Sequence, residues 1–401
     1  MTAIRGAGLA VGQRVQVTIE KVAHGGHFIA RHEGQVLFIR HGIPGEVVTV
    51  EVTSRTEKFA RGDVVEVHQP DAERVTPPCA YSGAGKCGGC DFQHISAKRQ
   101  RQLKSDVITE QFSRLAKMEI SVEVEEVSPD LHWRTRAGLT SSADGKLGFF
   151  AHRSHNVVEI SDCVIVAEAA GLADLSKKLW QANSTVEISV GSDAAVTIAT
   201  APKSEKPVPA KLKSGNEFLT EVINGRELRV HHNAFWQGNS KAPEVLSNVV
   251  RDYAGVKPGD HVLDLYGGVG LFAAAILDEI GPGGRVDVFE SSPWAVADAK
   301  VNFQAAPNVF IHEGDVIRNI SLMKRCDVVI LDPPRDGAGA AVIEKIARLD
   351  ARTIVYVACD PAALARDSAY LAAAGFVLQE IRAFDLFPMT HHIECVARFT
   401  K

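Results

Sequence analysis

The chain has no apolar run of the roughly 18 residues that cross a bilayer, and its first residues lack the basic and apolar segments of a secretory signal. We therefore expect a cytoplasmic protein without a membrane-spanning segment. No internal repeat of the kind that builds a solenoid is present. Positive charge is not in excess either: the formal net charge is −5, so only a local basic patch would indicate a nucleic-acid partner.

The residue pattern divides the 401-residue chain into three regions. Residues 1–70 form short alternating runs separated by glycine-rich turns, which predicts a small β-barrel. Residues 71–232 are again mainly strand-like, with one helix over 96–117 that we expect to pack on the third region. Residues 233–401 alternate strands with helices, which predicts a Rossmann-like parallel sheet covered on both faces. The expected fold class is therefore multi-domain α/β.

Cysteine is sparse, but three of the seven cysteines are clustered: Cys79, Cys87 and Cys90 have the spacing C-x7-C-x2-C. An odd count in a chain expected to be cytoplasmic argues against a disulfide framework, and clustered thiols in such a chain more often bind a metal. Four thiolates are usually needed to hold structural zinc or an iron–sulfur cluster, and Cys163 is the candidate fourth ligand. The spacing alone does not distinguish zinc from iron–sulfur.

The third region carries polar residues where its strands end, and ligands bind at that edge of a parallel sheet. Tyr266 and Gly268 lie in the glycine-rich turn LDLYGGVGLF, which lets the backbone approach a nucleotide-like cofactor. Glu290 ends the second strand and can bind ribose hydroxyls, whereas Asp315 follows the third strand and can face an adenine amino group. Asp332-Pro333-Pro334 makes a stiff turn after the fourth strand. These features indicate an S-adenosylmethionine site, with a Rossmann NAD site as the main alternative.

Cys359 follows the fifth strand, just before a helix that Asp360 can cap. The helix N-terminus favours the thiolate, whereas the charge of Asp360 opposes it. Further along the chain, Glu394 offers a carboxylate. A thiol, a carboxylate and a bound group donor indicate covalent chemistry on a base. Cys326 and Cys395 lie in or beside apolar runs, so we expect them to be buried and inert.

Two basic stretches are candidate RNA contacts. Lys104 lies in the helix predicted over 96–117, and Trp133 stands beside Arg134 and Arg136. Basic groups can contact phosphates, and an aromatic ring can stack on an unpaired base. The alternative for the helix is a solvated surface. The alternative for Trp133 is partial burial beside arginines that form salt bridges.

The motifs together resemble the RNA uracil-C5 methyltransferase family, and the resemblance covers nearly all of the chain. It is carried by a TRAM-like start, GGHFIARHEGQVLFIRHGIPGEVV, and by CGGCDFQH, FWQGN, LDLYGGVGLF, LDPPRDG, VACDPAALARD and FPMTHHIECV. It implies that Cys359 is the nucleophile and Glu394 the general base. It implies that S-adenosylmethionine contacts Gln237, Tyr266, Glu290 and Asp332. It also implies that a [4Fe–4S] cluster is held by Cys79, Cys87, Cys90 and Cys163.

The same resemblance implies methylation of a uridine at C5 through a covalent adduct between Cys359 and C6 of the base. The implied partner is RNA, 23S ribosomal RNA more than transfer RNA, with no membrane and no obligate protein partner. A uracil-C5 methyltransferase of transfer RNA and a non-catalytic RNA-binding protein stay open. A cytosine-C5 or DNA methyltransferase also stays open, although Arg335 stands where RNA cytosine-C5 enzymes carry a second cysteine.

Four features depart from the pattern of this family. The spacing between the first two clustered cysteines is longer than usual, which affects the expected geometry of a cluster. Ala358 replaces a common serine, Met389 a common glutamine and Thr135 a common asparagine. We expect these three replacements to affect the shape of the substrate site more than the chemistry.

Overall fold

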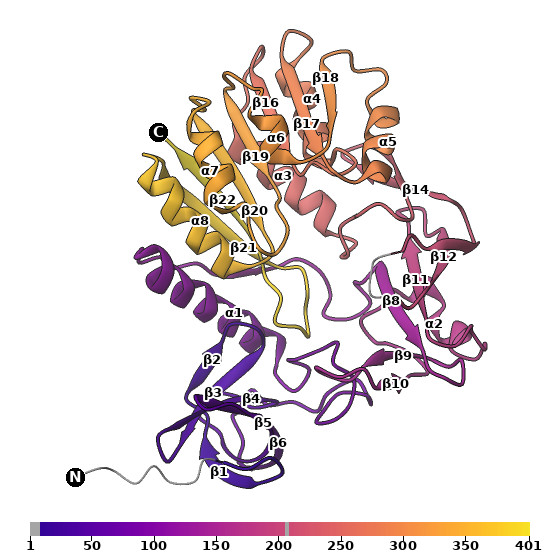
Figure 1. Cartoon of the computed structure of the whole chain (residues 1–401), viewed down its shortest axis with the longest axis vertical. Helices are drawn as coiled ribbons and strands as arrows, with labels where there is room; N and C mark the ends of the chain where they lie inside the picture. Colours follow the sequence, from indigo (N-terminus) through magenta and orange to yellow (C-terminus); the bar gives the residue numbers. More distant parts are fainter. Residues whose placement is uncertain (1–8, 205–207) are drawn as a thin grey trace.

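The computed structural model describes residues 9–204 and 208–401 of the chain. Figure 1 shows the N-terminal strands at one end of the molecule, the α/β region at the other and the middle region beside both. The first eight residues of the predicted barrel region lie outside the described residues. Within the described ranges, no helix is both long and apolar enough to cross a membrane.

The N-terminal region is a strongly curved sheet of six strands in the order β1-β5-β6-β4-β3-β2. All neighbours are antiparallel except β4 and β6, and β1 also contacts β3, so the sheet closes on itself as a half-barrel. Alternate side chains point inward, among them the fully buried Phe28, Leu37 and Ile39. This confirms the predicted barrel. Its strands are β1 (Arg14–Thr18), β2 (Lys21–Ala23), β3 (His27–His32), β4 (Gln35–Arg40), β5 (Val47–Arg55) and β6 (Phe59–Gln69).

The middle region contains a second sheet of six antiparallel strands in the order β10-β9-β8-β11-β12-β13. A separate hairpin follows, and it turns at Asn224-Gly225, where both residues have positive φ as a tight hairpin requires. The hairpin packs against α5 of the third region. The elements are β8 (Arg136–Ser141), β9 (Leu147–Phe150), β10 (Val157–Glu159), η2 (Glu168–Ala170), α2 (Leu172–Leu175), β11 (Ser184–Val190), β12 (Val196–Pro202), β13 (Lys211–Ser214), β14 (Phe218–Ile223) and β15 (Arg226–His231).

The third region is built on an eight-stranded sheet in the order β18-β17-β16-β19-β20-β22-β21-β7. The first five strands in this order are parallel, and β22 lies antiparallel between β20 and β21. The strands are β16 (His261–Leu265), β17 (Arg285–Glu290), β18 (Val309–Glu313), β19 (Val328–Leu331), β20 (Thr353–Ala358), β21 (Val377–Asp385) and β22 (Glu394–Thr400). The helices are α3 (Ala242–Ala254), α4 (Leu271–Ile280), α5 (Pro293–Asn302), α6 (Val316–Ile320), α7 (Gly339–Ala347) and α8 (Pro361–Ala373). This alternation confirms the predicted Rossmann-like fold.

The eighth strand of that sheet comes from a distant part of the chain. Strand β7 (Val124–Glu126) pairs in parallel with the end of β21. It follows helix α1 (Ala97–Gln111) and a π-helical turn, η1 (Phe112–Ala116), both of which contact α8. The segment between the barrel and the middle sheet therefore packs on the third region.

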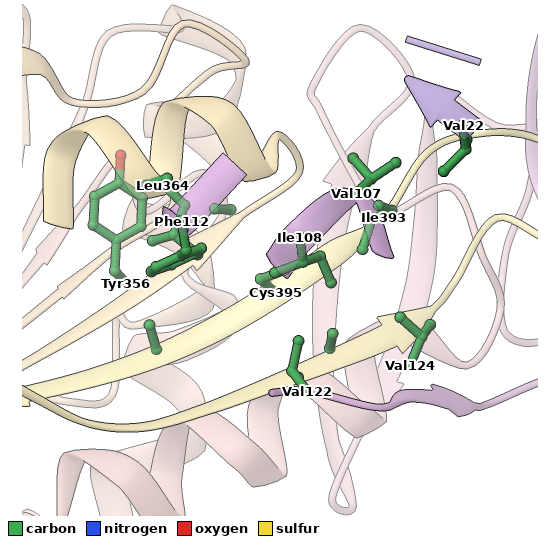
Figure 2. Close-up of a cluster of buried hydrophobic side chains, with 14 of the residues drawn as sticks. Val22, Val107, Ile108, Phe112, Val122, Val124, Tyr356, Leu364, Ile393 and Cys395 are labelled. Atoms are coloured by element: carbon green, nitrogen blue, oxygen red, sulfur yellow. The ribbon is translucent and has the colours of Figure 1, made fainter. Parts of the chain in front are cut away.

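Helix α1 also joins the barrel to the third region through one continuous apolar core. Figure 2 shows Val107 between Val22 of the barrel and Ile393, which precedes β22. Further along the chain, Ile108 lies beside Cys395 of β22 and Phe112 lies beside Leu364 of α8. All of these side chains are buried. The position of the barrel is therefore fixed by side-chain packing against the sheet that carries the candidate site.

Candidate active site

The pairing of β20 with β22 brings Cys359 and Glu394 together. Ala358 is directly opposite Cys395, and the strands are antiparallel. Cys359 directly follows Ala358 and Glu394 directly precedes Cys395, and the two side chains lie close enough for the charge of Glu394 to raise the pKa of Cys359. The two predicted catalytic residues therefore meet because two strands, far apart along the chain, end side by side.

A third acidic side chain lies close to this pair. Asp332 follows β19, the neighbour of β20, and its charge raises the pKa of both Glu394 and Cys359. Burial is the larger cause in each case: Glu394 is only 3% exposed and has a pKa well above the usual value. Burial also raises the pKa of Asp332, to about 7. A negative charge on one of these three groups therefore makes ionisation of the others less favourable.

The thiol of Cys359 is neutral at physiological pH. Burial, followed by the carboxylates of Glu394 and Asp332, raises its pKa to about 12, and the guanidinium of Arg335 only partly opposes them. The carboxylate of Asp360 caps helix α8 by accepting from the N–H groups of Ala362 and Ala363, at 2.9 and 2.8 Å. The negative charge of Asp360 also raises the pKa of Cys359. The expectation that the helix N-terminus favours the thiolate is therefore outweighed by burial and by acidic neighbours.

The barrel forms one wall of the pocket that contains Cys359. The pocket is lined by the turn between β2 and β3, by α1, by Arg335 and by His391 and His392. His24 in that turn places Nε2 2.9 Å from Oδ2 of Asp360. This contact could not be predicted from the sequence, because His24 and Asp360 are far apart in the chain and no motif links them.

The glycine-rich turn after β16 has the backbone geometry of a cofactor cradle. Tyr266 and Gly268 both have positive φ, 61° and 58°, and the N–H of Gly268 donates to Glu290 at 2.9 Å. Gly267 packs so closely that an added Cβ would lie 2.6 Å from Val288. A side chain at position 267 would therefore push the turn out of place.

Asp264, near the end of β16, was not among the predicted binding residues, but its surroundings are unusual for a carboxylate. It is fully buried, and its Oδ2 accepts from the N–H of Ala273 at 3.0 Å. Its Oδ1 is buried, and the part of the chain that the structure describes gives it no hydrogen-bond partner. Burial raises the pKa of this carboxyl to about 7. A buried acceptor without a partner beside a glycine-rich turn fits the donor groups of a nucleotide-like cofactor.

The remaining predicted cofactor residues occupy the same edge of the sheet. Gln237 is buried, and its amide lies 3.4 Å from Oδ2 of Asp332. Asp315 is exposed and caps α6 by accepting from the N–H of Arg318 at 2.9 Å, and its charge reaches Tyr266. Asp315 and Asp332 thus lie after the parallel strands where the sequence placed them, and Gln237, implied by the resemblance alone, reaches Asp332 from the segment before α3.

The four cysteines of the middle region lie within electrostatic reach of one another. Cys87 interacts with Cys79, and Cys90 interacts with both Cys87 and Cys163. Burial, with these neighbours, raises the pKa of Cys87 and Cys163 and brings that of Cys90 to about 12. Across residues 9–204 and 208–401, however, no group of three or more His, Cys, Asp or Glu side chains has an arrangement that could hold a metal ion.

Two of the residues considered as RNA contacts, Lys104 and Trp133, are buried. Lys104 is buried and pairs with Asp385, Nζ to Oδ1 2.6 Å. Trp133 is 3% exposed, and Arg136 pairs with Glu221 at 3.2 Å. The alternative for Trp133, burial beside a salt-bridged arginine, is therefore the observed one. For Lys104 both the phosphate contact and the solvated surface are wrong, because its side chain is buried against Asp385 at the end of β21.

Comparison with known proteins agrees with this geometry. The family model for the TRAM domain matches residues 9–65, and the model for tRNA (Uracil-5-)-methyltransferase matches residues 312–401. An uncharacterized RNA methyltransferase of Streptomyces coelicolor is 39% identical, over 96% of this chain and 93% of its own length. The chain belongs to the RNA uracil-C5 methyltransferase family. A further relative of this methyltransferase, 31% identical over 97% of the chain, is the 23S rRNA (uracil(1939)-C(5))-methyltransferase RlmD of Shewanella amazonensis.

The fold of the methyltransferase also matches a solved structure. The tRNA (uracil-54, C5)-methyltransferase of Pyrococcus abyssi, in complex with S-adenosyl-L-homocysteine, superposes with a TM-score of 0.74 at 23% identity. The match covers 96% of this chain and 99% of that one. At this level of identity the match establishes the shared architecture.

Proposed function

We propose that the protein methylates C5 of a uridine in 23S ribosomal RNA, with S-adenosylmethionine as the donor and a covalent adduct at Cys359. The observation that carries this proposal is the meeting of Cys359 with Glu394, one residue beyond the Ala358–Cys395 pair. A nucleophile and a base on adjoining strands can act in turn on C6 and C5 of the same pyrimidine ring.

The chemistry assigns one step to each residue. Cys359 gives its proton to solvent and forms an S–C6 bond, which displaces the electron pair of the C5–C6 double bond toward C5. C5 then bonds to the methyl carbon of the donor, whose sulfonium–methyl bond breaks. Glu394, in its ionised form, removes the proton from C5. The S–C6 bond then breaks, which restores the double bond of the base and frees Cys359. The target base has to be unpaired or flipped out of a helix to reach the pocket.

The residues at the carboxyl ends of β16, β17 and β19 would hold the donor. Oε1 of Glu290 already accepts from the N–H groups of Ser291 and Ser292, whereas within the described residues Oε2 accepts only from the N–H of Gly268 and so has one lone-pair site left for a ribose hydroxyl. Asp264 supplies the buried oxygen that lacks a partner. Tyr266 and Gly268 belong to the turn, and the charge of Asp315 reaches Tyr266. Asp332, which Gln237 contacts, is within electrostatic reach of both Asp264 and Cys359. This order would direct a methyl group toward C5 of a base held at Cys359.

Ribosomal RNA is the proposed substrate because relatives at 30–31% identity are named 23S rRNA (uracil(1939)-C(5))-methyltransferases. Transfer RNA is the second candidate, because the family model that matches residues 312–401 carries that substrate in its description. Purified protein would be incubated with methyl-labelled donor and equal amounts of 23S rRNA or bulk tRNA. We expect 5-methyluridine in the ribosomal RNA and none with Cys359→Ala. Label found only in tRNA, or as 5-methylcytidine, would contradict the proposal.

For the cysteines we propose a [4Fe–4S] cluster held by Cys79, Cys87, Cys90 and Cys163, with zinc as the alternative, although the arrangement of these four side chains in this structure is not one that holds a metal ion. The support is chemical: all four thiols are partly buried, and burial together with neighbouring thiols raises the pKa of Cys87, Cys90 and Cys163, so these three are difficult to ionise unless a cation neutralises them. Protein purified without oxygen should be brown and contain about four irons per chain if all four thiols bind one such cluster. Stoichiometric zinc without visible absorption would contradict the cluster and favour the alternative.

A non-catalytic RNA-binding protein would need neither a nucleophile nor a base. Cys359 and Glu394 are both present and adjacent, so this class is disfavoured. The methyl-transfer assay separates the two classes directly, because a binding protein would retain RNA and transfer no label.

A further inference from the structure

Asp91 is a buried carboxylate at which three regions of the molecule meet. It directly follows Cys90 and is 7% exposed. Its Oδ1 lies 3.4 Å from the guanidinium of Arg40 at the end of barrel strand β4. Its Oδ2 lies 2.5 Å from Nδ1 of His391, in the loop that leads into β22. The two oxygens of one side chain therefore contact the barrel and the catalytic loop.

The backbone around Asp91 holds the same loop a second time. The N–H groups of Asp91 and Phe92 both donate to the carbonyl of Met389, at 3.1 and 3.0 Å. From the opposite side, Oε1 of Gln100 on α1 accepts from the N–H of Met389 at 2.8 Å. Met389 has φ of 68°, an uncommon value for a residue with a side chain. This turn is therefore kept in place by hydrogen bonds from two other segments.

The barrel packs closely against this junction. Gly26, in the turn between β2 and β3, approaches so closely that an added Cβ would lie 2.8 Å from Nδ1 of His391 and 2.9 Å from Cγ of Asp91. Its φ of 76° is also in the region that favours glycine. The barrel turn, the cysteine-bearing loop and the catalytic loop are thus in direct contact.

The loop held in this way leads to the chemistry. His391 and His392 line the pocket of Cys359, and their ring centres are 4.2 Å apart. His392 lies 3.5 Å from the guanidinium of Arg335, which faces the same pocket. Glu394 follows after Ile393. A change in the position of residue 391 therefore moves both one wall of the pocket and the start of the strand that carries the base.

We infer that Asp91 is a positioning residue for Glu394: through His391 and the Met389 turn it fixes the catalytic loop, and it ties that loop to the barrel and to the cysteine-bearing segment. The reading of Glu394 as base rests on the proposed function. That Asp91 holds residues 386–393 in place does not depend on the proposed function. Because Asp91 directly follows Cys90, a displacement of Cys90 would also displace Asp91 and, through Asp91, the catalytic loop.

The test compares Asp91→Asn with Asp174→Asn, which removes an equally charged but exposed carboxylate of the middle region. Amide hydrogen exchange would be followed in residues 386–393. We expect faster exchange there in Asp91→Asn, no change in Asp174→Asn, and unchanged metal content in both. Unaltered exchange would overturn the inference, and so would loss of metal as the main effect of the substitution.

Activity gives the second readout. Misplacement of a catalytic group by about 1 Å can cost on the order of 100-fold in rate. For Asp91→Asn we expect turnover to fall at least about tenfold, with RNA affinity nearly unchanged and covalent protein–RNA adduct accumulating because proton removal is slowed. Weaker RNA binding with normal turnover would contradict a positioning role.

A double-mutant cycle identifies the contact responsible. If Asp91 acts through His391, then Asp91→Asn combined with His391→Gln loses no more activity than the more severe single variant. Additive losses would show that the two residues act separately. Should Asp91→Asn fail to fold, Arg40→Gln and His391→Gln each remove one partner of Asp91 and are tested by the same exchange measurement. If the native protein transfers no methyl group, the proposed function fails, whereas the exchange result still decides the mechanical inference.

Discussion

After burial, the carboxyl of Glu394 makes the largest contribution to the raised pKa of the Cys359 thiol. The nucleophile and the base therefore oppose each other's ionisation in the resting protein. Two negative charges this close in a buried site are costly, so the thiol stays protonated until the substrate changes its surroundings. The same proximity is what lets the two groups act on neighbouring atoms of one ring.

Substitution of Cys359→Ala should abolish methyl transfer and adduct formation while leaving cofactor affinity within about twofold of the native value, because the thiol touches the base and not the donor. Cofactor binding would be measured by calorimetry and adducts on denaturing gels. Cys326→Ala is the matched control, because Cys326 is buried and does not line the pocket. This variant should keep the methyl-transfer activity of the native protein. Loss of cofactor binding in Cys359→Ala alone would contradict its assignment as nucleophile.

Substitution of Glu394→Gln should trap a covalent protein–RNA adduct. Addition and methyl transfer do not require the base, whereas removal of the C5 proton does, so the reaction should stop before Cys359 is released. The adduct would be detected as a slow band on a denaturing gel that disappears after digestion of the RNA. Glu125→Gln, which alters an exposed ion pair with Arg382, serves as the control. Turnover equal to that of the control would exclude Glu394 as the base.

The single-turnover rate should rise with pH between about 6 and 9. Burial and neighbouring charge raise the pKa of Glu394 well above its usual value, that of Asp332 to about 7 and that of Cys359 to about 12. Both the base and the nucleophile react in the deprotonated form, and higher pH increases that fraction of each. A rate limited by one such group increases up to tenfold per pH unit below its pKa. A rate that falls across this range would contradict the assigned protonation states.

Substitution of Asp264→Asn should stabilise the free protein and weaken cofactor binding. The pKa of Asp264 is raised from 3.8 to about 7 in the folded protein, mainly by burial. The folded state therefore holds the proton more tightly than the unfolded state, and this group's contribution to stability is lost as pH rises from about 4 through 7. At pH 8 the buried charge costs roughly 1–3 kcal/mol, which asparagine avoids. Thermal unfolding at pH 5 and pH 8 would check this, and a gain that is larger at pH 5 would contradict it.

The sequence predicted the edge of the sheet because the relevant signals are local. A strand, a glycine turn and a helix N-terminus are encoded by consecutive residues, so Glu290, Asp332 and Cys359 could be placed at strand ends without knowing the tertiary fold. The junction around Asp91 could not be predicted in this way. It depends on Gly26, Arg40 and His391, which are brought together only when barrel, linker and catalytic loop pack.

Lys104 illustrates the same limit for charge patterns. Its basic neighbours in the sequence suggest a helix surface, but the side chain is buried against Asp385. Lys104→Met should destabilise the protein by about 3–5 kcal/mol, because it leaves a buried carboxylate without its partner. Lys98→Met, on the same helix, is the control and should change stability by less than about 0.5 kcal/mol. Denaturant unfolding curves would show the difference, and equal midpoints for the two variants would contradict a stabilising role of the pair.

Strand β7 has a consequence for how the enzyme can be divided. It forms the outer edge of the catalytic sheet, with Val124 paired to Ala383, and α1 covers one face of the same sheet. A fragment that begins at residue 233 would therefore present β21 as an unprotected edge next to an uncovered apolar surface, both of which promote aggregation. During synthesis on the ribosome, α1 and β7 are made before β21 and β22, so they cannot pack on the catalytic sheet until these last strands have been made. Expression of the cofactor-binding half alone should consequently give insoluble protein, and co-expression with residues 1–126 should restore solubility.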